Sequence, residues 1–197
     1  TELAATASDA VNALDELYGV QLFDLAARTR PKAMYFSEIM SYIQLTGVIF
    51  PYISEPNINV HQPAYGIPST MCHELSHICG FMREDEANFI SYLACYHSGN
   101  IELQYSGAMM GLIHATNRLY RYDPNAWQEI CSLLPEGVLR DISANSRYWK
   151  KYETPVGEAA DRWNDAYLKA NAQTDGVQSY GRMVDLLIAF YRSQNAL

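Results

Sequence analysis

The sequence predicts an α+β, mainly α fold: a single domain over residues 1–197, with a small β element just before a helix that carries the pattern His-Glu-x-x-His. Apolar residues recur at helical spacing along most of the chain, whereas β-branched and aromatic residues bounded by Gly and Pro gather only near residues 47–62. The content of 49% hydrophobic and 18% charged residues is typical of a globular protein. No linker or repeat divides the chain, so one core is expected.

The first part of the chain is expected to be helical over residues 2–29, where apolar positions recur among acidic ones. The segment "RTRPKAM" breaks this helix, and a short helix resumes at 36–44. The segments "GVIFPYI" and "PNINVHQ" then predict two short strands. Pro51 favours an edge position for the first strand, because proline cannot donate a hydrogen bond to a neighbouring strand.

The helix that carries the motif is expected to begin at Ser69 or Thr70, since either side chain is a good N-terminal cap. Gly80 is expected to end it. The remaining chain predicts further helices, several of which begin near a proline, where proline is tolerated. Their expected ranges are 83–97, 104–122, 124–134, 136–152, 156–172 and 177–193.

The segment "HELSH" predicts a metal site. His73 and His77 are four residues apart, so on a helix they project from the same face, one turn apart. Two neutral imidazoles at that spacing can hold one Zn²⁺, and Glu74 is then placed to take a proton from a metal-activated water. The alternative is a helix whose two histidines lie at the surface or are satisfied by hydrogen bonds in the core.

A catalytic zinc site uses three protein ligands and leaves one position for water, so a third ligand is required. The acids of "REDEANF" follow directly after Gly80. Glu84 is favoured because it shares a helix face with the small Ala87, which allows close helix packing, and with Asn88, which could hydrogen-bond a ligand. Glu86 is the alternative, although its face resembles a core face, and Asp85 is third. The same acids could simply stabilise a helix N-terminus.

The segments "HELSH" and "EDEAN" together resemble the gluzincin zinc peptidases, a group that includes thermolysin-type and CAAX-prenyl-endopeptidase-type enzymes. In these enzymes a Glu of the pattern E-x-x-[AS]-[DN] on the following helix is the third ligand. The resemblance implies a zincin-like domain with Zn²⁺ held by His73, His77 and Glu84, and with Asn88 beside a ligand. The spacing departs from the thermolysin type, because only six residues separate His77 from Glu84.

The metzincin pattern H-E-x-x-H-x-x-G-x-x-H also has a glycine at the position of Gly80, but its third histidine falls on Arg83 here. The whole chain is similar to an uncharacterised bacterial family of membrane-anchored proteins regarded as metallopeptidases. The shared stretches are "SEIMSY", "CHELSH", "REDEANF", "YSG" and "DGVQSYGRMVDLL". This similarity implies hydrophobic spans before the present segment, in a longer protein. It also implies a location at the bacterial cell membrane, with this domain in solution and outside the cytoplasm.

Amide hydrolysis usually needs a second electrophile to stabilise the developing oxyanion. The family similarity favours Tyr180 and Arg182 for this role, and Tyr105 and His114 are weaker candidates. His114 lies within an apolar helix, where a histidine is more often a core residue with satisfied hydrogen bonds. A peptide substrate is expected to lie along the edge strand of "GVIFPYI", unless this is an ordinary edge strand.

The sequence therefore predicts zinc-dependent hydrolysis of peptide bonds, with a peptide or protein as substrate. The alternative is a non-catalytic, zinc-stabilised helical domain that binds a partner or acts as a scaffold; the intact Glu74 argues against it. The net charge of −8, with 14 basic and 22 acidic residues and no dense basic cluster, disfavours nucleic acid as a partner.

Overall fold

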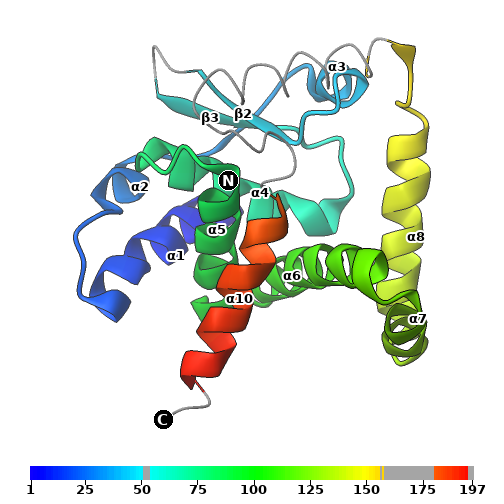
Figure 1. Ribbon diagram of the computed structural model, residues 1–197. Helices are drawn as coiled ribbons and strands as arrows, with labels where there is room; N and C mark the ends of the chain where they lie inside the picture. The colour runs from blue at the N-terminus through cyan, green and yellow to red at the C-terminus, as the bar shows by residue number, and fades with distance from the viewer. Residues whose placement is uncertain (51–53, 156, 158–179, 195–197) are drawn as a thin grey trace.

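Figure 1 shows the computed structural model, which describes residues 1–50, 54–155, 157 and 180–194. The described chain is mainly helical with one three-stranded sheet, which confirms the predicted α+β, mainly α class. The predicted helix 156–172 lies outside the described residues apart from position 157. The prediction of a single domain over 1–197 stays a prediction.

The N-terminal stretch forms two helices, α1 (Glu2–Tyr18) and α2 (Asp24–Arg28), and the expectation of continuous helix over 2–29 was wrong. Gly19 ends α1 in the left-handed conformation, at φ 65°, which favours glycine. The Asp15 carboxylate then accepts hydrogen bonds from the backbone N–H groups of Leu22 (2.7 Å) and Phe23 (3.1 Å). These bonds hold the loop in place and satisfy amides that a continuous helix would have paired.

The sheet contains three short strands in the order β1-β3-β2: β1 (Lys32–Ala33), β2 (Gly47–Phe50) and β3 (Glu55–Ile58). Strand β3 pairs in parallel with β1 and antiparallel with β2, with Gly47 opposite Ile58. The edge position expected for the first predicted strand is confirmed for β2. The two-residue β1 was not predicted. Helix α3 (Ser37–Tyr42) connects β1 to β2.

Helix α4 (Ile67–Ile78) carries the motif and follows a short 3₁₀ turn, η1 (Ala64–Gly66). It begins before Ser69 and Thr70, so neither residue is its N-terminal cap. Both hydroxyls lie in the first turn and donate to the Gly66 carbonyl, at 3.1 and 2.9 Å. Pro68 occupies the first turn, where its missing N–H costs no helical hydrogen bond.

The helices that follow α4 begin and end close to the predicted positions. Asn100 and Asp123 cap two of them, each accepting two backbone N–H groups through its side chain. None of the described helices is both long enough and apolar enough to cross a bilayer. These helices are α5 (Glu84–His97), α6 (Ile101–Tyr122), α7 (Pro124–Ser132), α8 (Glu136–Lys150) and α10 (Tyr180–Gln194).

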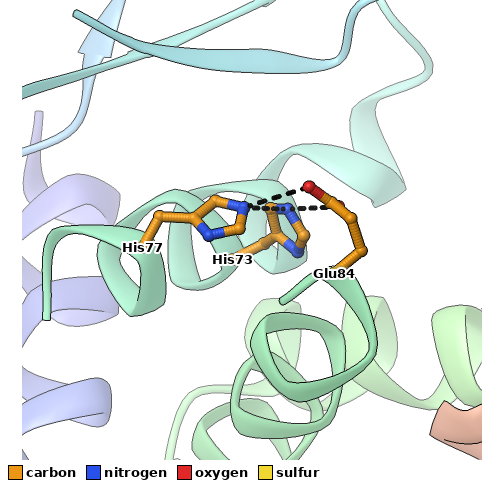
Figure 2. Close-up of side chains that lie close together, drawn as sticks. All are labelled: His73, His77 and Glu84. Atoms are coloured by element: carbon orange, nitrogen blue, oxygen red, sulfur yellow. Dashed lines mark hydrogen bonds and ion pairs between the residues drawn. The ribbon is translucent and has the colours of Figure 1, made fainter. Parts of the chain in front are cut away.

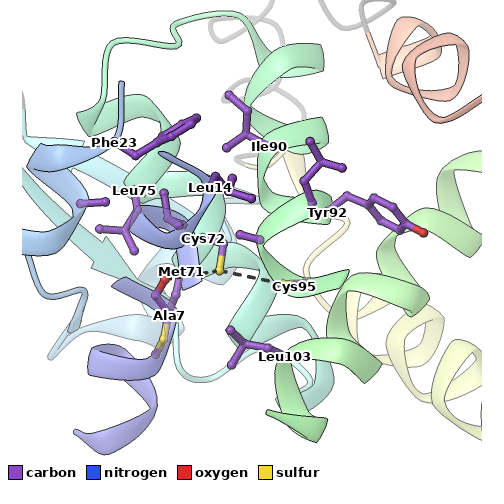
Figure 3. Close-up of a cluster of buried hydrophobic side chains, with 14 of the residues drawn as sticks. Ala7, Leu14, Phe23, Met71, Cys72, Leu75, Ile90, Tyr92, Cys95 and Leu103 are labelled. Carbon is purple, nitrogen blue, oxygen red and sulfur yellow. Dashed lines mark hydrogen bonds between the residues drawn. The ribbon is translucent and has the colours of Figure 1, made fainter. Parts of the chain in front are cut away.

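The core lies where α1, α4 and α5 meet, with α6 and α10 packed on α5 and with β2 and β3 on α4 (Figures 1 and 3). Leu14, Leu75 and Leu103 are almost fully buried there. Burying each such side chain stabilises the fold by about 1.5–3 kcal/mol. Because Leu75 belongs to the metal-motif helix, the core holds that helix in position.

A glycine in α6 provides a test of this packing. A Cβ atom added at Gly107 would lie 2.4 Å from Cys95 Cβ on α5. We expect Gly107→Ala to lower the free energy of unfolding by about 1–3 kcal/mol, because overpacking outweighs the gain in helix propensity. Urea denaturation followed by circular dichroism measures this.

The matched control is Gly137→Ala in α8, where the nearest atom to an added Cβ is an Arg140 side-chain nitrogen at 3.9 Å. This variant should be neutral or gain up to about 1 kcal/mol. Equal stabilities for the two variants would show that α5 and α6 are not packed as closely as described.

Candidate metal centre

Helix α4 separates its apolar residues from its histidines. Met71, Cys72 and Leu75 belong to the core cluster, whereas the largely buried side chains of His73 and His77 point away from it and have 15% and 12% of their surfaces exposed. The helical period produces this separation, since positions 71, 72 and 75 share one face and positions 73 and 77 another. Packing of the apolar face of α4 in the core therefore fixes the position of both imidazoles on the opposite face.

The chain turns sharply after α4 through Gly80, which adopts φ 96°. The N–H of Gly80 donates to the His77 carbonyl at 2.9 Å, and the N–H of Phe81 donates to the Ser76 carbonyl at 3.2 Å. This pair of bonds is the Schellman arrangement, which requires a left-handed residue at the position of Gly80. Phe81 then stacks on Phe23, with ring centroids 5.4 Å apart.

This turn also orients His77. Its Nδ1 lies 2.7 Å from the Phe81 carbonyl oxygen, so Nδ1 carries the proton and donates it, while Nε2 presents a lone pair. Such a contact is the usual means of orienting a metal-binding imidazole. His73 lacks one: its Nδ1 is buried without a hydrogen-bond partner among the described residues.

Glu84, the first residue of α5, completes a cluster of three possible ligands (Figure 2). The Nε2 atoms of His73 and His77 are 3.0 Å apart, and the Glu84 oxygens lie 3.4 and 3.5 Å from them, respectively. A tetrahedral zinc ion with bonds of about 2.0–2.1 Å separates its ligand atoms by about 3.3 Å. The spacing and the N,N,O donor set therefore fit zinc.

The other two acids have different partners. Asp85 is buried and forms a two-pronged ion pair with Arg83, at 3.1 and 2.7 Å, and also accepts the N–H of Glu86 at 3.1 Å. Glu86 has 46% of its side chain exposed and lies 3.4 Å from Arg83. Of the three acids considered from the sequence, the geometry thus brings only Glu84 to the histidines.

Their neighbours shift the pKa values of Glu84 and His73. Burial alone would raise the pKa of Glu84, but hydrogen bonds and charge from His73 and His77 hold the pKa of that carboxyl well below its ordinary value. Burial alone would lower the pKa of His73, but Glu84, with smaller effects from Glu74 and Asn88, raises it. The carboxylate is thus ionised and ready to bind a cation.

Glu74 is buried, with 5% of its surface exposed, and burial raises its pKa while His73 and His77 oppose the shift. Its carboxyl group lies directly against Gly47 at the start of β2, where an added Cβ would come within 2.4 Å of Oε1. The side chain is therefore confined between α4 and the edge strand of the sheet.

A cavity of about 250 Å³ opens on His73 and Glu84. Asn88 lines it and is buried, in line with its expected place beside a ligand. His114 lines it as well, and burial together with the nearby His73 lowers its pKa to about 4. His114 is therefore a neutral imidazole near the ligands, whereas its position in the sequence favoured a core histidine. Glu74 is not among the described residues that line this cavity.

The remaining predicted residues are not brought to the ligands by the described part of the chain. Tyr105 donates a hydrogen bond to Asp141 at 2.5 Å, which with burial raises its pKa to about 12. Arg182 is exposed on α10 and is not among the described residues lining the cavity. The side chain of Tyr180 lies outside the described part of the chain.

Sequence reasoning missed cavity residues that come from distant segments. Among them, Thr46 and Gln62 flank the sheet, and Asn145 and Trp149 belong to α8. Trp149 Nε1 donates to Asn145 Oδ1 at 3.2 Å. No local pattern signals their role, because they lie between 11 and 76 residues from His73 in the sequence and reach the site only by folding.

The fold and the cluster together define a mainly helical domain with a candidate three-ligand metal centre. The chain belongs to the family described as "Protein of unknown function (DUF3810)", whose model matches residues 1–188. No curated protein and no solved structure matches the chain.

The first prediction for this centre is its metal content. We expect about one zinc per chain after reconstitution and dialysis, lost in Glu84→Ala because two imidazoles alone bind zinc weakly, and retained in Glu86→Ala, whose carboxylate faces Arg83. Elemental analysis measures this, with circular dichroism to verify folding. Loss of zinc in Glu86→Ala, but not in Glu84→Ala, would show that Glu86 is the third ligand.

The turn at Gly80 can be tested separately from the ligands. Gly80 and Gly19 both follow a helix with positive φ, and neither has a neighbour within 4 Å of an added Cβ. Each change to Ala should therefore cost about 1–2 kcal/mol of backbone strain. Only Gly80→Ala should also weaken zinc binding, by about 10–100-fold, because it disturbs the Phe81 carbonyl that orients His77.

Zinc titration of both variants with a chromophoric competitor makes the comparison. Gly80→Asn, which tolerates the left-handed conformation better, should recover most of the affinity. Equal zinc affinities for Gly80→Ala and Gly19→Ala would contradict a role of the turn in the metal centre.

Proposed function

We propose that this chain is a zinc-dependent peptidase. The observation that carries the proposal is the convergence of His73 and His77 on α4 with Glu84 at the start of α5, within 3.0–3.5 Å of one another. Glu74 lies next to His73 on α4. A metal-binding trio together with an adjacent carboxylate is the minimum that metal-assisted hydrolysis needs.

The number of ligands supports a catalytic rather than a purely structural zinc. Within the described ranges, the His73, His77 and Glu84 cluster has no fourth His, Cys, Asp or Glu ligand. A structural zinc site has four protein ligands, whereas a catalytic one has three and an open position. Zinc bound here would polarise a substrate carbonyl and lower the pKa of a water molecule.

Glu74 is the proposed general base. It follows His73 directly on α4, its carboxyl group is held against Gly47, and its pKa is raised by burial. In this position it accepts a proton from the attacking water and then donates that proton to the leaving amine, so that the peptide bond is cleaved with one base.

His114 is the proposed second electrophile, rather than the exposed Arg182. The role predicted for Tyr180 stays a prediction. His114 lines the same cavity as His73 and Glu84, and burial keeps its imidazole neutral. A neutral imidazole N–H can donate a hydrogen bond to the carbonyl oxygen as negative charge develops there.

The proposed substrate is a peptide or protein in an extended conformation, and nucleic acid is not a proposed partner. Strand β2 is an edge strand whose Gly47 touches the Glu74 carboxyl group. An extended peptide added to this edge would carry its backbone past the proposed base.

A second candidate, a zinc-stabilised binding or scaffold domain, is favoured by the position of Glu74. The residue is buried and does not line the described cavity. If the base cannot reach water, zinc would serve only to join α4 and α5.

We also propose a location at the bacterial cell membrane, outside the cytoplasm, with anchoring segments beyond the given sequence. The support is the similarity to a membrane-anchored family described above. Fractionation of cells that express the whole gene product tests this location, and recovery only in the cytosolic fraction would reject it.

Hydrolysis itself provides the decisive prediction. The zinc-loaded chain should cleave components of a mixed peptide library, and chelation should abolish cleavage. Glu74→Gln should retain zinc and lose about 10²–10⁴-fold in kcat/KM. His114→Gln should also retain zinc and lose about 10²–10³-fold, mainly in kcat. Mass spectrometry of the products measures cleavage by the zinc-loaded chain, the chelated chain and both variants. Zinc content without any cleavage would favour the scaffold.

A further inference from the structure

The cavity beside the metal ligands lies between two parts of the structure. Its inner wall is formed by α4, α5 and α6, and its outer wall by α8. In Figure 1, α8 runs from α7 back toward α3. The volume of about 250 Å³ is below the roughly 300–1,000 Å³ of sites that enclose a whole drug-sized ligand. The space is suited to one large side chain.

The walls carry little charge. Apart from His73, Glu84 and the neutral His114, the described lining residues are polar but uncharged or apolar. Several polar groups are already paired: Gln62 donates to the Thr46 carbonyl at 3.2 Å, and Ser106 Oγ accepts the Ser69 N–H at 2.9 Å. When zinc engages His73 and Glu84, the described lining holds no further acidic or strongly basic side chain, so a charged group that enters this space would lose its hydration without a side chain of opposite charge to pair with.

The other lining groups offer apolar surface. Met110 and Ile113 on α6 face the cavity together with the rings of Tyr65 and Trp149. Aromatic and aliphatic groups of this kind bury a large uncharged side chain favourably, by removing its apolar surface from water.

We propose that this cavity is the specificity pocket of the proposed peptidase, and that it takes a large uncharged side chain next to the scissile bond. The inference rests on the proposed function, because the ligands His73 and Glu84 at the cavity place the scissile carbonyl beside it. The substrate class is then peptides with an aromatic or branched aliphatic residue at the cleavage site.

Helix α8 supplies the specificity-determining residues Trp149 and Asn145. No residue of α8 is fully buried, and half-buried side chains together with polar contacts hold it in place. Tyr148, which directly precedes Trp149 in the sequence, makes two such contacts. Its Oη lies 2.9 Å from His61 Nδ1 and 2.5 Å from Ser41 Oγ. The position of Trp149, and with it the width of the pocket, therefore depends on this docking.

The test uses hydroxamic acids, which chelate zinc through a constant head group and differ only in a benzyl, isobutyl, aminobutyl or carboxymethyl side chain. Calorimetry measures their binding to the zinc-loaded chain, independently of turnover. We expect the benzyl and isobutyl compounds to bind at least about tenfold more tightly than the two charged ones. Chelated protein should bind none of them.

Two variants address the wall. Trp149→Ala should reduce the preference for benzyl by about tenfold, whereas Trp127→Ala, on α7 and packed on Tyr120, should leave it unchanged. Asn145→Asp keeps the acceptor for Trp149 Nε1 and adds a carboxylate, so the aminobutyl compound should bind about tenfold more tightly than to the wild type.

The outcomes separate this inference from the proposed function. Equal zinc-dependent binding of all four compounds, or cleavage of peptides without side-chain preference, would overturn the pocket and leave the metal centre standing. The expected preference without any peptide cleavage would support the pocket and reject the peptidase. Absence of zinc-dependent binding would overturn both.

Discussion

The candidate metal centre depends on how the chain crosses the six residues between His77 and Glu84. Gly80, in the left-handed conformation, reverses the chain within a single turn. Phe81 then acts in two directions, since its carbonyl orients the His77 ring and its own ring stacks on Phe23 in the core. The orientation of a proposed ligand is thereby coupled to hydrophobic packing. A longer connection between α4 and α5 would not place the carbonyl and the ring of the same residue at both contacts, so core packing would no longer orient the His77 ring.

The fold class and most helix boundaries could be predicted because they follow from local pattern: apolar spacing, caps such as Asn100 and Asp123, and prolines at helix starts. The errors fall where a side chain bonds to the backbone in an unexpected way. Asp15 accepts two amides and divides the N-terminal helix, and the hydroxyl of Thr70 turns back to Gly66 instead of capping α4. Such choices among hydrogen-bond partners depend on tertiary contacts that one sequence does not reveal.

The parts of the candidate site that lie close together in the sequence could be predicted, and the distant parts could not. The pairing of His73 with His77 requires only the helical period, and the preference for Glu84 over Glu86 follows from the faces of one further helix. Asp85 and Arg83 pair with each other, which leaves Glu84 free to face the histidines. His114, Trp149 and the other cavity residues come from distant segments. Their approach is decided by the docking of α6 and α8, for which the sequence contains no periodic signal.

The absence of fully buried residues in α8 has an evolutionary consequence. The ligands and the proposed base belong to helices whose other faces form the core, so few substitutions there are compatible with folding. The demand is weaker on α8, where no described residue is fully buried. Substitutions at the exposed positions of α8 should therefore cost little stability, so that the proposed pocket can change its preference while the proposed ligands on α4 and α5 stay the same.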